Sequence, residues 1–243
     1  MDGSTGAAGD PMVEITIEDD DRGRWTLLGS GGEEPVLIAL AGAGMAPERL
    51  RAEAARCTAL VAADAGAALC LAAGLLPDAV VGDFDSLPAE ARARIPADRL
   101  HPSDDADSND LEKALAFVAA GWGADTEVVL AAGGGVDGGR MDHALANLGP
   151  IVREPHARIS MLDGEGRLFA LRHGRATFDG LAGKRLSLLP WSLRGVTASE
   201  SGVRYPLARA HLVLGGRGVS NEITGDRAIV EVPDGVALLW VEA

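Results

Sequence analysis

The chain has 243 residues, with 36 acidic and 22 basic side chains and a formal net charge of −14 at pH 7. This balance argues against a nucleic-acid partner, because phosphate backbones are bound by basic surfaces, but it allows a nucleotide whose metal ion supplies positive charge. No apolar run reaches membrane-spanning length, and residues 1–11 lack the composition of a secretory signal. We therefore expect a soluble, cytoplasmic protein with no membrane partner.

The N-terminal part of the chain predicts a short arm. Residues 1–11 are small and polar, and we expect them to be disordered. Residues 13–17 alternate between apolar and polar side chains, and residues 25–28 provide a return strand after a charged turn, so a hairpin is predicted. Cys57 and Cys70 lie in apolar segments and are expected to be buried thiols.

From residue 36 onward, short apolar runs alternate with segments of helical composition. Strands are predicted at 36–40, 59–63, 79–81 and 126–131, and helices at 47–57, 67–73, 88–97, 111–118 and 144–148. This alternation indicates a mostly parallel sheet covered on both faces. Ligands of such sheets bind at the carboxyl ends of the strands, where Gly42, Gly44, Asp64, Asp83 and Asp85 are expected to meet.

Asp83 and Asp85 directly follow the predicted strand at 79–81. Two close carboxylates repel each other unless a cation lies between them, and hard oxygen ligands suit Mg²⁺. The alternative is a solvated acidic turn, and this stretch alone does not decide between the two.

A second acidic segment, residues 103–110, includes Asp104 and ends at Asp110, where a helix is predicted to begin. Asp110 has two interpretations. It could stabilise the start of the helix as part of a cap, or it could join the other aspartates around a metal or a metal–phosphate complex. The density of aspartates exceeds what a cap needs.

A glycine-rich loop at residues 132–139 connects a strand to a helix and is followed by Arg140, Asp142 and His143. Its glycines would let backbone N–H groups approach a phosphate, and Arg140 and His143 are suitable donors. The loop is neither a dinucleotide fingerprint nor a P-loop. Asp142 is alternatively a helix-start residue, and His143 a packed core histidine.

From about residue 158 the pattern changes to short apolar runs separated by Gly, Pro and Asp, which predicts an all-β region, most simply a sandwich. The predicted fold class is thus an N-terminal, mostly parallel α/β domain followed by a C-terminal β-sandwich. The predicted division is an arm or hairpin at 1–34, an α/β domain at 35–157 and a sandwich at 158–243.

Six motifs occur in a fixed order: A-A-D-x-G at 62–66, P-D-x-x-x-G-D-F-D-S at 77–86, N-D-L-E-K-A-L at 109–115, G-G-R-M-D-H-A-L-A-N-L at 138–148, G-V-R-Y-P-L at 202–207 and V-S-N-E at 219–222. Their order and spacing resemble those of thiamine pyrophosphokinases over about residues 36–243. The resemblance implies transfer of the pyrophosphoryl group of ATP to thiamine, giving thiamine diphosphate and AMP. It also implies a homodimer with active sites between subunits.

The resemblance also implies roles for individual residues. Mg²⁺ ligands would be Asp64, Asp83, Asp85 and Asp110, of which Asp83, Asp85 and Asp110 would be catalytic. The ATP and phosphate site would comprise Asp64, Gly66, Asp104, Arg140, Asp142 and His143. Thiamine-binding residues would be Tyr205, Ser220 and Asn221, although Ser220-Asn221 alone indicates an ordinary turn.

The chain departs from the family pattern at Ala65 and Ala68, where glycine and asparagine are usual, and at Asn109, where threonine is usual. Ala65 would matter if its position required positive φ or close approach to a ligand. Two alternatives follow: a Mg²⁺-dependent phosphotransferase or nucleotide hydrolase with another acceptor, and a non-enzymatic thiamine- or nucleotide-binding protein.

Overall fold

A computed structural model describes residues 13–27, 34–42, 44–132, 140–153 and 158–242. The predicted disordered lead and most of the glycine-rich loop lie outside these ranges. The chain forms two compact units, one of residues 1–32 and 171–237 and the other of residues 33–170 and 238–243. The units differ from the predicted division, since residues 158–170 belong with the α/β elements and the N-terminal hairpin belongs with the strand-rich unit. No helix among the described residues has the length and apolar character needed to span a membrane.

The α/β unit is built on a parallel sheet with the strand order β6-β5-β4-β3-β7-β8. These strands are β3 (Val36–Ala39), β4 (Ala59–Ala63), β5 (Ala79–Gly82), β6 (Leu100–Pro102), β7 (Val128–Ala131) and β8 (Ile159–Leu162). The start of β9 (Gly166–Asp179) runs antiparallel to β8. Every residue of β3, β4, β5 and β7 is buried, as expected for a sheet covered on both faces. The predicted fold class is confirmed.

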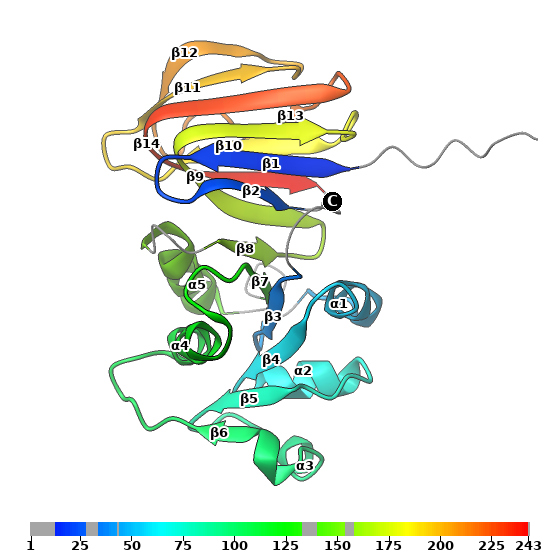
Figure 1. Ribbon diagram of the computed structural model, residues 1–243. Helices are drawn as coiled ribbons and strands as arrows, with labels where there is room; N and C mark the ends of the chain where they lie inside the picture. The colour runs from blue at the N-terminus through cyan, green and yellow to red at the C-terminus, as the bar shows by residue number, and fades with distance from the viewer. Residues whose placement is uncertain (1–12, 28–33, 43, 133–139, 154–157, 243) are drawn as a thin grey trace, which may run out of the picture. The chain divides into compact units, whose positions relative to one another are not determined.

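Helices α1 (Pro47–Ala54), α2 (Gly66–Ala72) and α3 (Ala89–Arg92) lie on one side of this sheet, and α4 (Asp110–Trp122) and α5 (Met141–Arg153) lie on the other (Figure 1). Two local predictions differ from the structure. Of the helix expected at 88–97, only the part in α3 is helical, because the residue before Pro96 is disfavoured in helical conformation. A 3₁₀ turn (Ala97–Arg99) follows. Strand β6 is too short to produce a sequence pattern.

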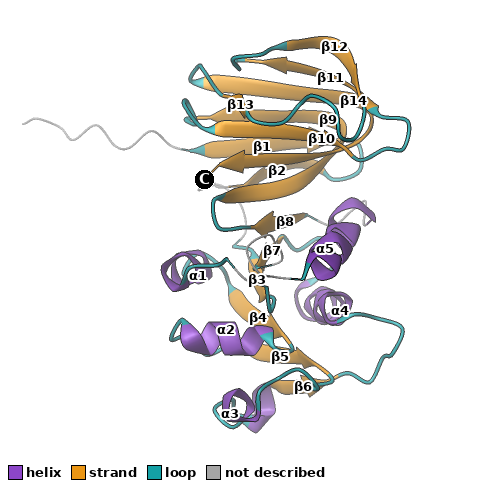
Figure 2. Ribbon diagram, turned by 180° about the vertical axis from the view of Figure 1, so that it is seen from behind, coloured by secondary structure: helices purple, strands orange, loops and turns teal. Residues whose placement is uncertain are grey.

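The regular elements described in the other unit are all strands (Figure 2). They are β1 (Glu14–Asp19), β2 (Gly23–Leu27), most of β9, β10 (Arg185–Pro190), β11 (Val196–Ser201), β12 (Leu207–Leu212), β13 (Asn221–Glu222) and most of β14 (Arg227–Glu242). The predicted hairpin is β1–β2, and β1 also pairs with residues 174–179 of β9. The apolar face of the hairpin is buried, and its side chains are Ile15, Ile17, Trp25 and Leu27.

Strands β9 and β14 are each longer than the separate runs that the sequence indicates. Gly174 continues β9 because its Cα lies against β1, where a Cβ would come within 2.2 Å of the Glu18 carbonyl oxygen. Gly235, at φ +88°, continues β14 directly after residues 231–234, where the register with β11 shifts. Glycine here permits close approach and a bulge within a strand instead of ending it.

Candidate functional site

The carboxyl edge of the parallel sheet carries three non-glycine residues in the left-handed region. Asp64 follows β4 at φ 42°, Phe84 follows β5 at φ 65°, and Ala132 follows β7 at φ 61°. Each conformation costs about 1–3 kcal/mol and persists only where the surrounding structure enforces it. The backbone therefore leaves the sheet in an enforced direction at three places on this edge.

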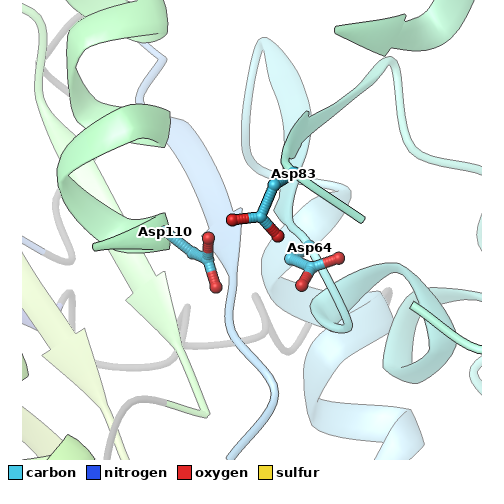
Figure 3. A group of neighbouring side chains, drawn as sticks. All are labelled: Asp64, Asp83 and Asp110. Carbon is cyan, nitrogen blue, oxygen red and sulfur yellow. The ribbon is translucent and has the colours of Figure 1, made fainter. Parts of the chain in front are cut away.

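Three carboxylates converge at this edge. Asp64, Asp83 and Asp110 each offer an oxygen, and these oxygens all lie within 4.8 Å of one another. Figure 3 shows the side chains pointing toward one another from the end of β4, the loop after β5 and the start of α4. Three such charges repel one another unless cations or protons compensate them.

Asp64 is the buried member of this three-carboxylate group, with 1 % of its surface exposed. Its Oδ2 accepts a hydrogen bond of 3.3 Å from the Ser86 backbone N–H, whereas its buried Oδ1 has no protein partner. Burial, followed by the charge of Asp110, raises the pKa of Asp64 from 3.8 to about 6. An unpaired buried carboxylate oxygen costs free energy, and a divalent cation would satisfy it.

Gly82 gives Asp64 the space that it occupies. A Cβ at Gly82 would lie 2.9 Å from the Asp64 Cβ, closer than side chains pack. The glycine of the G-D-F-D-S motif is therefore explained by the close approach of two strand ends.

Lys113, on α4, joins the group, although nothing in its sequence context marks it as a site residue apart from its spacing from Asp110. Its Nζ lies 3.0 Å from Asp83 Oδ2 and 3.5 Å from Asp110 Oδ1, and its side chain is 5 % exposed. Burial lowers the pKa of Lys113, but the hydrogen bond to Asp83 and the charge of Asp110 outweigh it, so the pKa lies above its usual value. The same hydrogen bond lowers the pKa of Asp83. The spacing of three residues from Asp110 on one helix was the signal available in the sequence.

Asp110 does not cap α4, because Asn109 does. Asn109 Oδ1 accepts a hydrogen bond of 3.0 Å from the Glu112 N–H, and the Asn109 N–H donates to Glu112 Oε2 at 3.1 Å, which is a complete capping box. The Asp110 carboxylate is therefore left for the three-carboxylate group. Asparagine caps a helix at least as well as threonine does. Asn109 in place of the family's threonine therefore costs the helix no stability.

Asp85 and Asp104 lie outside the three-carboxylate group. Both are exposed, and Asp85 Oδ1 accepts a hydrogen bond of 2.9 Å from Ser86 Oγ. The backbone N–H of Asp85 also donates to Asp83 Oδ1 at 3.2 Å, which helps to orient Asp83. In the acidic segment, Asp105 rather than Asp104 forms the local turn, by accepting hydrogen bonds from Ser108 and Asp107.

A cavity of about 290 Å³ adjoins the three-carboxylate group. Its lining includes Leu40, Gly42, Asp64, Ala65, Ser86, Asn109, Asp110, Ala132, Arg140 and His143. His143 is exposed to this space, which excludes the interpretation as a packed core histidine.

Asp142 lies in the first turn of α5 and forms an ion pair with Arg140, whose hydrogen bond lowers the pKa of Asp142 to about 2. Asp142 therefore orients a guanidinium at the cavity wall.

The two residues after Asp64 have different requirements. Ala65 has φ −61°, an ordinary helical value, so the family's glycine is not needed there for conformation. Gly66 is buried against β3, and a Cβ on it would lie 2.1 Å from the Ala39 carbonyl oxygen. Gly66 thus serves the packing of α2 against the sheet.

The expected thiamine-binding residues lie in the strand-rich unit. Tyr205 is 67 % exposed, and Ser220 is exposed at φ 58°, with its N–H donating to Ser187 Oγ at 3.0 Å. Asn221 is buried and forms hydrogen bonds with both backbone polar groups of Tyr205. The structure thus brings Tyr205 and Asn221 together, and Ser220 adopts the turn conformation that its sequence indicates.

Two family models match the chain in order. The model described as "Thiamin pyrophosphokinase, catalytic domain" matches residues 50–162, and "Thiamin pyrophosphokinase, vitamin B1 binding domain" matches residues 175–237. Thiamine pyrophosphokinase of Bacillus subtilis is 28 % identical over 187 residues, which cover 74 % of this chain and 85 % of the relative.

Solved structures show the same fold. The crystal structure of thiamine pyrophosphokinase from Bacillus subtilis superposes with a TM-score of 0.73 at 23 % identity, covering 86 % of this chain and 98 % of that one. Thiamin pyrophosphokinase from Candida albicans gives a TM-score of 0.73 at 18 % identity, covering 94 % and 98 %.

Proposed function

The chain belongs to the thiamine pyrophosphokinase family, and we propose that the three-carboxylate group is the centre at which it transfers the pyrophosphoryl group of ATP to thiamine. The products are thiamine diphosphate and AMP. The observation that carries the placement of the centre is the convergence of Asp64, Asp83 and Asp110 beside a cavity at the carboxyl edge of the sheet.

Asp64, Asp83 and Asp110 would hold Mg²⁺, and Asp85 would join them from the adjoining loop. The fit rests on the donor set, which is all carboxylate oxygen, and on the buried Asp64 Oδ1 that has no protein partner. When bound, Mg²⁺ neutralises charge on the phosphate oxygens during transfer.

The protein's own groups would position the reactants. Pyrophosphoryl transfer depends mainly on in-line placement and charge stabilisation. Arg140, held by Asp142, and His143 would bind phosphate oxygens from one wall of the cavity, with Gly66 and Asp104 as further members of the proposed nucleotide site. Lys113 would keep Asp83 and Asp110 oriented. Asp83 or Asp110 is the candidate acceptor for the thiamine hydroxyl proton, and we assign neither.

The strand-rich unit would supply the thiamine side through Tyr205, Ser220 and Asn221. An exposed aromatic ring such as that of Tyr205 suits a cationic substrate. We further propose a homodimer with active sites between subunits, as the family resemblance implies, and a cytoplasmic location.

The alternative acceptors lose their main support. They were suggested by the substitutions around Asp64, and at one of these, Ala65, the backbone is ordinary helix and needs no glycine for its conformation. The deciding experiment measures AMP and thiamine diphosphate formed from ATP and Mg²⁺, with and without thiamine. Equal amounts of both products, formed only with thiamine, are expected; ADP formation regardless of thiamine would refute the proposal.

Binding of Mg²⁺ should weaken in mild acid. Asp64 has a pKa raised to about 6, so below that pH a proton occupies the carboxylate that the metal needs. We expect the apparent Kd to rise about tenfold between about pH 7.5 and about pH 5, measured by calorimetric titration with Mg²⁺. Asp64→Asn should bind more weakly and lose this pH dependence. Equal affinity of the unaltered protein at both pH values would contradict the assignment.

Ser220→Ala should affect thiamine alone. Loss of one hydroxyl hydrogen bond is expected to raise the KM for thiamine about fivefold, with kcat and the KM for ATP changed less than about twofold. Ser199→Ala, which removes the acceptor for the Arg209 N–H in the same unit, is the control and should leave all three constants unchanged. An effect of Ser220→Ala confined to ATP would place the thiamine site elsewhere.

A further inference from the structure

A buried polar chain leads from β11 to the backbone of Tyr205. Glu200, on β11, is 3 % exposed, and Asn221, on β13, is 5 % exposed. Glu200 Oε2 accepts a hydrogen bond of 3.1 Å from Asn221 Nδ2. Burying a carboxyl group inside a sheet costs free energy, and burial raises the pKa of Glu200 to about 7. A glutamate at this buried position therefore needs a structural or functional reason.

The Asn221 amide has no hydrogen-bonding capacity left for a ligand. Its Oδ1 accepts from the N–H groups of Tyr205 and Glu222, both at 3.0 Å. Its Nδ2 donates to the Tyr205 carbonyl oxygen at 3.0 Å and to Glu200. A primary amide offers two donors and two acceptor lone pairs, and these four bonds use all of them.

This amide continues a ladder that the backbone does not complete. Val203 forms a bridge with Ile223, and the Arg204 N–H donates to the Glu222 carbonyl oxygen at 2.8 Å. At the next residue, Tyr205, the Asn221 side chain replaces a peptide group by pairing with both the N–H and the C=O. The backbone polar groups of Tyr205 itself are therefore paired with a side-chain amide, which Glu200 orients.

We propose that Glu200 and Asn221 are positioning residues for thiamine: Glu200 fixes the Asn221 amide, and that amide fixes the backbone that presents the Tyr205 ring. Asn221 then acts through Tyr205 and does not itself contact the substrate. This inference rests on the proposed function, in which the Tyr205 ring faces thiamine.

Tyr205 is the single tyrosine of the chain, so fluorotyrosine labelling gives one ¹⁹F resonance that reports on this residue alone. Glu200→Leu removes the acceptor and leaves an Asn221 N–H unpaired. We expect this variant to shift or broaden the resonance and to raise the KM for thiamine about tenfold, with kcat and the KM for ATP changed less than about twofold. Glu200→Gln keeps a carbonyl acceptor and should restore both the resonance and the KM.

Ile17→Val is the control for a purely structural effect. Ile17 is fully buried in β1, which pairs with β2 and β9, so its truncation destabilises the same unit on strands that carry neither Glu200 nor Asn221, and it should leave the resonance and the thiamine KM unchanged. Two results would overturn the inference: a Glu200→Leu variant with the resonance and KM of the unaltered protein, or a Glu200→Gln variant as impaired as Glu200→Leu. Failure of the proposed function is distinguishable, because the unaltered protein would then form no thiamine diphosphate.

Discussion

Asp83→Ala is expected to lower thiamine-dependent AMP formation about 10³-fold, the size of effect seen when one group that stabilises transition-state charge is removed. The variant loses one of three converging carboxylates and the shorter of the two contacts to Lys113. Its fold should persist, because the Asp83 side chain is 43 % exposed. Steady-state kinetics with thermal unfolding on the same sample tests both statements.

Asp85→Ala provides the comparison within the same loop. Asp85 is exposed and lies outside the three-carboxylate group, so we expect its loss to reduce turnover less than about tenfold. Unchanged turnover of Asp83→Ala would remove the proposed centre from this edge of the sheet. Equal losses from both variants would show that Asp85 is a ligand of the same rank as Asp83.

Gly66→Ala should be the most destabilising single-methyl change at this site. The added Cβ would lie 2.1 Å from the Ala39 carbonyl oxygen, and neither α2 nor the central strand β3 can move away without disturbing the sheet. We expect the free energy of unfolding to fall by about 3 kcal/mol or more, as measured by urea denaturation.

Ala65→Gly is the matched control at the neighbouring position. Because Ala65 has φ −61°, restoring the family's glycine should change stability by less than about 1 kcal/mol and leave the KM for ATP within about twofold. A Gly66→Ala variant of normal stability would show that α2 does not pack this closely on β3. A large gain in ATP affinity for Ala65→Gly would show that the alanine methyl group obstructs the nucleotide.

The architecture of the α/β unit was predictable because its strands are buried on both faces. The runs at β3, β4 and β7 are continuous and apolar, and helical segments separate them. The long strands β9 and β14 were not predictable from local pattern. In the sequence, Gly174 and Gly235 indicate turns. Only the pairing of β9 and β14 with strands distant along the chain shows that each glycine lies within a continuous strand.

The site was predictable where topology alone determines proximity. Asp64 and Asp83 follow parallel strands, so their meeting follows from the fold. The role of Lys113 could not be predicted, because a lysine on a helix normally indicates a solvent-exposed face, whereas this one is buried beside Asp83. The hydrogen bonds of the Asn221 amide could not be predicted from the sequence either. One of them goes to Glu200, which is distant along the chain and carries no sequence signal of burial.

Lys113 has a consequence for the protein between catalytic cycles. Its ammonium group partly offsets the charges of Asp83 and Asp110, so the arrangement would stay assembled when the nucleotide leaves. Retention of a divalent ion would then depend mainly on Asp64, whose buried Oδ1 has no protein partner. The resting protein would then tolerate a chelator without unfolding.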